Sequence, residues 1–328
     1  MQNSYVIGLE GGGSFTRVMV ADLQGNILAY KESGSAHPYR DPRAGENIQN
    51  AVLQALRTAE VSLNEVVHFT AGLPSYQQEE DLPLAHSLLD IEGLACQKTI
   101  VNDSVVGHAG ALLFQPGIMV VSGTGSIVMG YTENGHVLFN STFRHYAPTA
   151  ARFLSYQAIH YLLAGQVELE DTAFIEQIFE FWGVKDMAEF RELALQDYHL
   201  SKQEMDRRFG LMAPILTVAA SQGVPLAVRV CDEAIRTLET GVRLLGSYFT
   251  DHDIPVCFVG SVIRSPYFSR RFSDILQRCS HKRYNIMEPL MSPVAGAVAM
   301  SLKESGIHVT DNIVERLLMH EKSLVSVL

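Results

Sequence analysis

A glycine-rich loop between two apolar runs occurs twice in this chain, and this repetition constrains the fold more than any other feature of the sequence. The first copy spans residues 6–20 and the second spans residues 118–129. In each copy a short turn, at residues 24–26 and 134–135, leads into a third apolar run. Apolar runs joined by such turns predict β-hairpins. We therefore predict two three-stranded antiparallel units, and two similarly built domains that face each other.

The first loop has the composition of a phosphate-binding turn. Three successive glycines allow the backbone to turn tightly and to approach a ligand closely. Backbone N–H groups and two hydroxyls would then surround an anion, and the candidate residues are Gly11, Gly12, Gly13, Ser14 and Thr16. Glu10 ends the first apolar run, where its carboxylate would hold a cation that neutralises the phosphate. The alternative is a glycine-rich hairpin turn that binds nothing.

The second loop repeats this composition and strengthens the interpretation of the first. Its candidate phosphate-binding residues are Ser122, Gly123, Thr124, Gly125 and Ser126. Two such loops from opposed domains would form a phosphate clamp in the cleft between the domains.

Asp103 is the candidate catalytic base. Residues 98–101 are predicted to form a strand, residues 105–113 a helix, and Asp103 lies between them. Ligands and catalytic groups of open α/β sheets gather at the carboxyl ends of strands. A carboxylate placed there can accept the proton of a hydroxyl that attacks a γ-phosphate. Alternatively, Asp103 only caps the helix that follows.

Four motifs in a fixed order carry a family resemblance. They are GLEGGGS at residues 8–14, ND at 102–103, SGTGS at 122–126 and VGSV at 259–262. This order resembles the BadF/BadG/BcrA/BcrD-type ATPase family, which includes the N-acetylglucosamine kinases. That family belongs to the superfamily of sugar kinases, actin and heat-shock chaperone ATPases. The similarity covers nearly the whole chain, and SGTGS is its most specific part.

The resemblance implies an α/β fold of two ribonuclease H-like domains, which are duplicated mixed β-sheets flanked by helices, with an interdomain nucleotide cleft. Residues 1–114 would form the N-terminal ATPase domain, and residues 115–309 would form the C-terminal domain with a helical insertion. A last helix, at about 310–328, would pack back on the first domain.

The resemblance also implies ATP and Mg²⁺ as cofactors and adds candidate site residues. Gly260 would border the adenosine, where Ser261 replaces the second glycine of the family's turn. Gly72 and Asn102 would line the substrate site beside Asp103. His37 stands near the position of a sugar-contacting asparagine, so it either contacts the ligand or is an exposed loop histidine.

Residues 143–152 depart from the family pattern. The sugar-phosphorylating members carry a tryptophan and an acidic loop here, whereas residues 146–150 read YAPTA. Arg144 and Tyr146 are the replacement candidates for substrate binding, with His145 and Arg152, and this set would suit an anionic ligand. The alternative is a loop that has drifted with loss of activity.

Composition narrows the classes of partner. A formal charge of −11 without basic runs argues against nucleic acid or anionic lipid as a partner. No apolar run reaches the roughly 20 residues that span a bilayer, and no signal sequence is recognisable, so we expect a cytoplasmic protein without a membrane partner. The four cysteines are scattered, which argues against a zinc site, a disulfide framework or the iron–sulfur cluster of the dehydratase activators. Homodimers are common among the relatives, so we expect a homodimer.

The leading hypothesis is an ATP-dependent kinase that transfers the γ-phosphate to a hydroxyl of a small substrate, with an amino sugar such as N-acetylglucosamine as the default by resemblance. The alternative is a BadF-type ATPase, or a nucleotide- or sugar-binding regulator, without sugar kinase activity. The presence of Asp103 favours the kinase, and the altered residues 143–152 favour the alternative.

Overall fold

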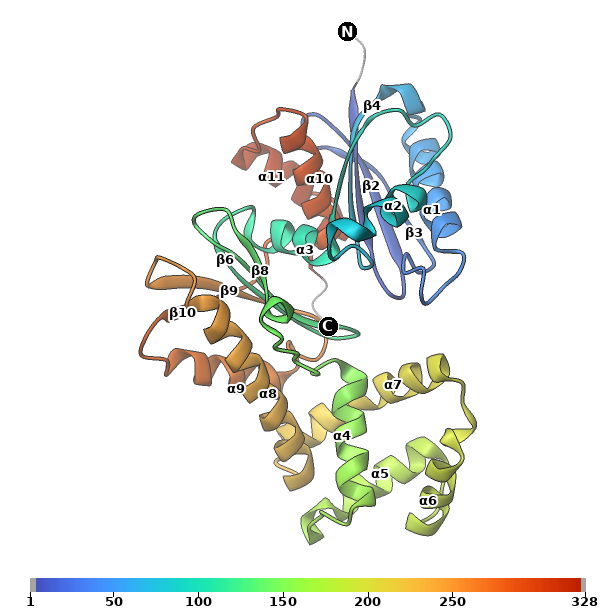
Figure 1. Cartoon of the computed structure of the whole chain (residues 1–328), viewed down its shortest axis with the longest axis vertical. Helices are drawn as coiled ribbons and strands as arrows, with labels where there is room; N and C mark the ends of the chain where they lie inside the picture. The colour runs from blue at the N-terminus through green and yellow to red at the C-terminus, as the bar shows by residue number, and fades with distance from the viewer. Residues whose placement is uncertain (1–3, 326–328) are drawn as a thin grey trace. The chain divides into compact units, whose positions relative to one another are not determined.

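The computed structural model describes residues 4–325. Contacts divide the chain into two compact units. Unit 1 joins residues 1–115 to residues 288–328, and unit 2 is residues 116–287. In Figure 1, unit 1 therefore combines the blue start and the red end of the chain.

Unit 1 contains a five-stranded mixed sheet in the order β3-β2-β1-β4-β5. Its first three strands are antiparallel and adjacent in sequence, whereas β4 and β5 run parallel to β1. The strands are β1 (Tyr5–Gly11), β2 (Thr16–Asp22), β3 (Ile27–Ser33), β4 (Val66–Leu73) and β5 (Gln97–Asn102). The helices are α1 (Ala44–Ala59), α2 (Leu82–Leu88), α3 (Asp103–Leu112), α10 (Pro293–Glu304) and α11 (Asp311–Leu318).

Side-chain alternation gives this sheet two buried faces. Ile7 and Leu9 of β1 belong to a core with α1, whereas Val6 belongs to a second core with α10 and α11. The helices accordingly cover both faces, with α1 and α2 on one side and α10 and α11 on the other (Figure 1). This is the layered arrangement expected of an α/β unit.

Helix α10 packs very closely on its neighbours because small residues line the contact. A Cβ atom on Gly296 would lie 2.3 Å from the carbonyl oxygen of Val106 in α3. A Cβ atom on Gly8 of β1 would lie 2.4 Å from the backbone nitrogen of Val298. Ser301 adds hydrogen bonds, donating to Ile7 O at 2.7 Å and accepting from the backbone N–H of Thr70 at 2.8 Å. Helix α10 is thereby fixed against β1, β4 and α3.

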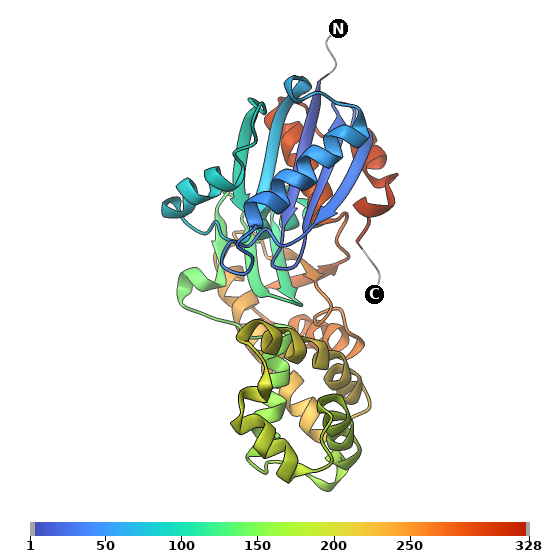
Figure 2. The same cartoon turned by 90° about the vertical axis from the view of Figure 1, so that its right-hand side faces the viewer.

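Unit 2 repeats the sheet of unit 1, in the order β10-β9-β6-β7-β8. Again three consecutive strands are antiparallel and two later strands are parallel. The strands are β6 (Gly117–Ser122), β7 (Ser126–Tyr131), β8 (Val137–Phe139), β9 (Asp253–Val259) and β10 (Arg283–Met287). The helices are α4 (Ala151–Leu163), α5 (Thr172–Trp182), α6 (Met187–Leu195), α7 (Lys202–Ser221), α8 (Pro225–Gly246) and α9 (Pro266–Gln277). Helices α4 to α7 form a helical layer, seen in yellow-green in Figure 2.

The two mixed sheets confirm the predicted α/β class, the duplication and the paired antiparallel units. The division of the chain differs in one respect from the predicted boundaries. The second segment of unit 1 begins at Glu288, so α10 belongs to unit 1. From the sequence, only the chain from about residue 310 was predicted to pack on the first domain. The predicted last helix ends as α11 at Leu318, followed by a short 3₁₀ turn at Glu321–Ser323, and residues 326–328 of that prediction lie outside the described residues.

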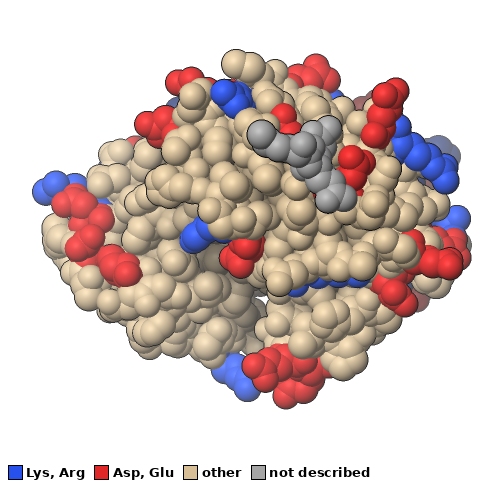
Figure 3. All heavy atoms as spheres, turned by 90° about the horizontal axis from the view of Figure 1, so that it is seen from above, with Lys and Arg blue, Asp and Glu red and all other residues tan. Residues whose placement is uncertain are grey.

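Charged side chains are dispersed on the face of the molecule in Figure 3, where lysine and arginine lie scattered among aspartate and glutamate. Within residues 4–325, no single helix has the length and apolar character to cross a membrane. Helices α7 and α8 together have the length and apolar composition of a membrane-spanning segment, but the chain bends by 105° between them.

Candidate functional site

Asp103 is the first residue of α3 and directly follows β5. The preceding Asn102 caps the helix, because its side-chain oxygen accepts a hydrogen bond from the backbone N–H of Ser104 at 3.0 Å. The amide nitrogen of Asn102 donates to the carbonyl oxygen of Tyr76 at 2.9 Å. The Asn102 side chain therefore holds the junction that positions Asp103.

Gly72 allows α3 to approach the sheet. It is buried near the end of β4, where a Cβ atom would lie 2.4 Å from Cγ2 of Val106 and 3.2 Å from Cα of Asp103. Any side chain at this position would push against the first turn of α3. Gly72, a predicted substrate-binding residue, thus lets α3 pack closely on β4 and so helps to position Asp103.

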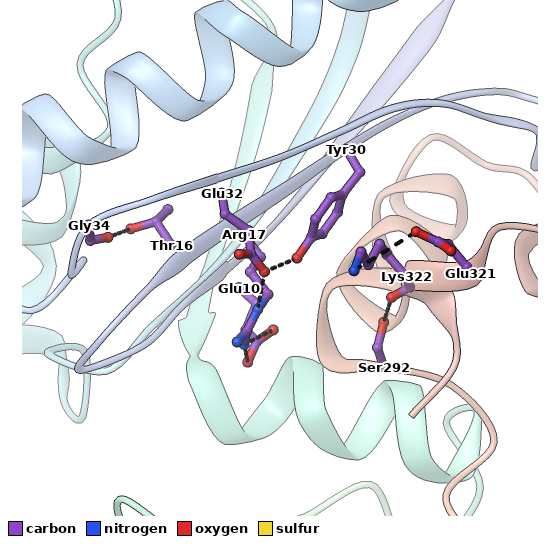
Figure 4. A network of polar contacts seen from close by, with 9 residues as sticks. All are labelled: Glu10, Thr16, Arg17, Tyr30, Glu32, Gly34, Ser292, Glu321 and Lys322. Atoms are coloured by element: carbon purple, nitrogen blue, oxygen red, sulfur yellow. Dashed lines mark hydrogen bonds and ion pairs between the residues drawn. The ribbon is translucent and has the colours of Figure 1, made fainter. Parts of the chain in front are cut away.

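Glu10 belongs to a row of charged side chains that crosses three strands (Figure 4). Arg17 lies opposite Glu10 in the β1–β2 register, and its Nη1 donates to both Glu10 oxygens at 3.2 and 3.3 Å. The Nε of Arg17 donates to Glu32 at 3.1 Å, and the Tyr30 hydroxyl also donates to Glu32. One guanidinium is therefore shared by two carboxylates.

The ionisation of Glu10 and Asp103 is coupled. Burial raises the pKa of Glu10, although Arg17 opposes the shift. Burial, and next the charge of Glu10, raises the pKa of Asp103 to about 6. A carboxylate with this pKa is ionised at neutral pH and is still a better proton acceptor than an ordinary aspartate.

This raised pKa predicts a pH-dependent gain in stability for Asp103→Asn. The folded state holds the Asp103 proton more tightly than the unfolded state, so stability falls as pH rises from about 3.9 to about 6. Asparagine removes that cost. A shift of this size corresponds to about 3 kcal/mol, and partial exposure reduces our expectation to roughly 1–2 kcal/mol.

Denaturant unfolding measured from pH 4 to pH 7.5 checks this prediction. Asp103→Asn should be more stable than the parent protein at pH 7.5, and the difference should approach zero at pH 4. A difference that is constant with pH, or a variant that is less stable at pH 7.5, would contradict the raised pKa.

Glu10 is the candidate Mg²⁺ ligand, and its charge acts on Asp103. No group of three or more His, Cys, Asp or Glu side chains that could hold a metal ion occurs among residues 4–325. Mg²⁺ commonly uses one or two carboxylates and takes its other ligands from substrate phosphates and water. The Glu10 carboxylate, oriented by Arg17, therefore suits this kind of site and not a cage made only of protein ligands.

The Gly11–Gly13 loop is braced by the segment 34–41. Thr16 donates from its hydroxyl to Gly34 O at 2.7 Å, so this predicted phosphate ligand is engaged in a structural bond. The backbone N–H of Ala36 donates to Gly12 O at 3.1 Å. Ser14, by contrast, is exposed.

His37 lies in this same segment and is half-buried. Its Nδ1 atom is buried without a hydrogen-bond partner. Burial, and next the charge of Arg40, lowers the pKa of His37, so the ring is neutral at pH 7. A neutral imidazole with an unpartnered nitrogen can accept or donate one hydrogen bond to a ligand.

In unit 2 the SGTGS loop is hydrogen-bonded to residues 143–152, the segment that departs from the family pattern. The hydroxyl of Ser122 donates to Thr149 O at 2.6 Å, and the hydroxyl of Ser126 donates to Ala147 O at 2.6 Å. Only Thr124 and Gly125 of this loop are exposed. The exposed tip, and not the two serines, is thus the part of the loop that is open to a ligand.

Residues 143–152 form an ordered segment. Arg144 adopts a left-handed conformation with a φ of 58°, and Asn140 donates from its side chain to His145 O at 2.9 Å. Tyr146 is 64% exposed. Arg152 donates to Thr124 O at 3.1 Å, which connects this segment to the tip of the SGTGS loop.

Gly260 forms the turn after β9 and packs on the same loop. Its φ of 106° is unfavourable for other residues, and a Cβ atom there would lie 2.5 Å from Ser122 O. That carbonyl accepts hydrogen bonds from the N–H groups of Val262 and Ile263 at 3.0 and 3.1 Å. Ser261 is exposed beside it. The structure therefore brings Gly260 and Ser261 together with Ser122 and Gly123.

A family comparison supplies the context for these loops. The sequence model of the BadF/BadG/BcrA/BcrD ATPase family matches residues 7–301. The chain belongs to this family. The match begins in β1 and ends within α10, so it includes all the candidate site residues described above.

Two relatives are sugar kinases by name. An N-acetylmuramic acid/N-acetylglucosamine kinase of Clostridium acetobutylicum is 28% identical over 133 residues, which is 40% of this chain and 44% of the relative. An N-acetyl-D-glucosamine kinase of Dictyostelium discoideum is 25% identical over 149 residues, 41% of this chain and 46% of the relative. Each match thus spans less than half of the relative's length.

A solved structure extends the similarity of the fold to nearly the whole chain. A structure provisionally described as an N-acetylglucosamine kinase, from Chromobacterium violaceum, has a TM-score of 0.69 at 19% identity. The superposition covers 92% of this chain and all of the other. The BadF-type chain therefore has the two-sheet α/β fold of that protein.

Two arginines beside the first loop were missed by the sequence analysis. Arg17 could have been found, because a hairpin that pairs Gly11 with Thr16 also places Arg17 opposite Glu10. Arg40 carries no such signal, since its position depends on the path of an irregular loop.

Proposed function

We propose that this family member is an ATP-dependent kinase that transfers the γ-phosphate of ATP to a hydroxyl of a small substrate, and that the substrate is an amino sugar such as N-acetylglucosamine. The observation that carries the proposal is Asp103, a half-buried carboxylate at the carboxyl end of β5 whose pKa is raised to about 6. The names of the two matched kinases support the choice of an amino sugar.

In this mechanism Asp103 acts as the general base. It accepts the proton of the substrate hydroxyl while the hydroxyl oxygen bonds to the γ-phosphorus and the bond from that phosphorus to the bridging oxygen of ADP breaks. The products are a phosphate ester and ADP. Asn102 and Gly72 keep Asp103 in position, and His37 is the candidate substrate contact from segment 34–41.

The glycine-rich loops bind phosphate in this proposal. The backbone of Gly11–Gly13 and the exposed tip at Thr124 and Gly125 would contact phosphate oxygens, and the Gly260 turn would border the adenosine. Glu10 would hold Mg²⁺, which would neutralise charge on the phosphates. A homodimer and a cytoplasmic location remain predictions from the sequence.

A second candidate function is a nucleotide-dependent ATPase or regulator without sugar kinase activity. The observation that favours it is the segment 146–150, whose carbonyls accept the hydroxyls of Ser122 and Ser126 and whose side chains include no acid or tryptophan. A sugar site needs hydrogen-bond partners for the hydroxyls that it removes from water.

ADP release separates the two functions. The assay would use Mg²⁺-ATP with N-acetylglucosamine, N-acetylmuramic acid, glucosamine or glucose, and with no sugar. The kinase predicts release that one or more of these sugars stimulates about tenfold or more over the sugar-free rate, because a closed site excludes water and so limits hydrolysis of ATP. Release that no sugar changes would contradict the kinase and favour the second candidate.

A further inference from the structure

Segment 34–41 folds back over the first glycine-rich loop. Its start is tied to the loop by the hydrogen bonds of Thr16 to Gly34 O and of Ala36 to Gly12 O. The backbone N–H groups of Arg40 and Asp41 both donate to His37 O at 2.9 Å, which closes a turn. This turn returns the side chain of Arg40 to the loop.

The Arg40 side chain lies against Gly13. A Cβ atom on Gly13 would be 2.7 Å from Nη1 of Arg40, 3.3 Å from its Cζ and 3.6 Å from its Cδ. The absence of a side chain at residue 13 therefore makes room for the guanidinium. Arg40 is also an exposed residue.

Two other arginines lie near this loop. Arg17 forms ion pairs with the carboxylates of Glu10 and Glu32. The Arg43 side chain is 71% exposed and pairs with Asp41 at 3.5 Å. The Arg40 guanidinium lies against Gly13 of the glycine loop itself.

We infer that Arg40 is a phosphate-binding residue, which contacts the phosphoryl oxygens of the nucleotide held at the Gly11–Gly13 loop. The inference rests on the proposed function, and it assigns to this loop a cation that the motif itself lacks. A guanidinium presents a planar set of donors that matches phosphate oxygens, and bonds of this charge-assisted kind are about twice as strong as neutral ones.

Nucleotide binding by calorimetry tests this inference without requiring turnover. Arg40→Ala should weaken ATP binding about 10- to 100-fold and should leave AMP binding within about twofold, because AMP lacks the β- and γ-phosphates. Arg40→Lys should recover only part of the loss, since lysine lacks the planar fork. Arg43→Ala, the matched control in the same loop, should bind ATP as the parent protein does.

A double-mutant cycle with Gly13→Ala gives a sharper test. The new Cβ would meet the far end of the flexible Arg40 side chain and displace it without unfolding the loop. Gly13→Ala should therefore weaken ATP binding by itself but cause little further loss in the Arg40→Ala background. Additive losses would mean that the Cβ obstructs the phosphate directly, and would count against a role for Arg40.

The outcomes separate this inference from the proposed function. If the parent protein binds ATP and Arg40→Ala binds it equally well, the role of Arg40 is wrong and the function stands. If the parent protein does not bind ATP at all, the proposed function fails. If Arg40→Ala keeps ATP affinity but weakens binding of an acidic sugar such as N-acetylmuramic acid, Arg40 binds a substrate anion and the assignment to the nucleotide is wrong.

Discussion

Asp103→Asn is expected to lower kcat for phosphoryl transfer by about 10²- to 10⁴-fold, the usual contribution of a general base. Asparagine keeps the size of the side chain and its place at the first position of α3, but it cannot accept a proton. KM for ATP should change little, because Asp103 acts on the substrate hydroxyl in this mechanism. The measurement is steady-state ADP release with the best sugar of the panel.

The control for this variant is Asp90→Asn, which replaces an exposed aspartate outside the site. It should retain the parental kcat. Full activity of Asp103→Asn, in protein shown to be folded by circular dichroism, would exclude Asp103 as the base.

Gly296→Ala is expected to destabilise unit 1 by about 3 kcal/mol, the upper part of the range for overpacking a core. The added Cβ would lie 2.3 Å from Val106 O and 2.4 Å from the backbone nitrogen of Gly110. Both contacts are to backbone atoms of α3, so the clash cannot be relieved by a side-chain rotation. Helix α3 would have to shift, and Asp103 at its start would shift with it.

Gly210→Ala is the matched control, because it is also a glycine inside a helix. Nothing lies within 4 Å of a Cβ atom at this position in α7. Alanine should therefore stabilise the protein by about 0.5–1 kcal/mol through its better helix propensity. Thermal or urea unfolding of both variants checks the pair, and equal effects would contradict the close packing of α10 on α3.

Local patterns in the sequence predicted the features that depend on neighbouring residues. The two hairpin units follow from apolar runs, turn residues and glycine-rich loops within about 30 residues of chain, and the sheets confirm them. The position of Asp103 between a strand and a helix was predicted in the same way, and the structure has β5 ending at Asn102 and α3 starting at Asp103.

Features set by contacts between distant residues could not be predicted in this way. The close packing of α10 on Gly8 and Gly110 leaves no local signal in the sequence, so the return of the chain to unit 1 was placed too late. The hydroxyls of Ser122 and Ser126 were expected at a phosphate, whereas they donate to carbonyls about 20 or more residues away. Such bonds depend on where an irregular segment lies in space, which periodicity does not encode.

The most direct test of the central claim follows the γ-phosphate itself. The protein would be incubated with ATP labelled in the γ-phosphate, Mg²⁺ and N-acetylglucosamine, and the labelled products would be separated. The proposed kinase predicts that most of the label appears as a sugar phosphate, and that Asp103→Asn forms almost none. Label found only as inorganic phosphate, at a rate that is independent of the sugar, would contradict the kinase and identify an ATPase.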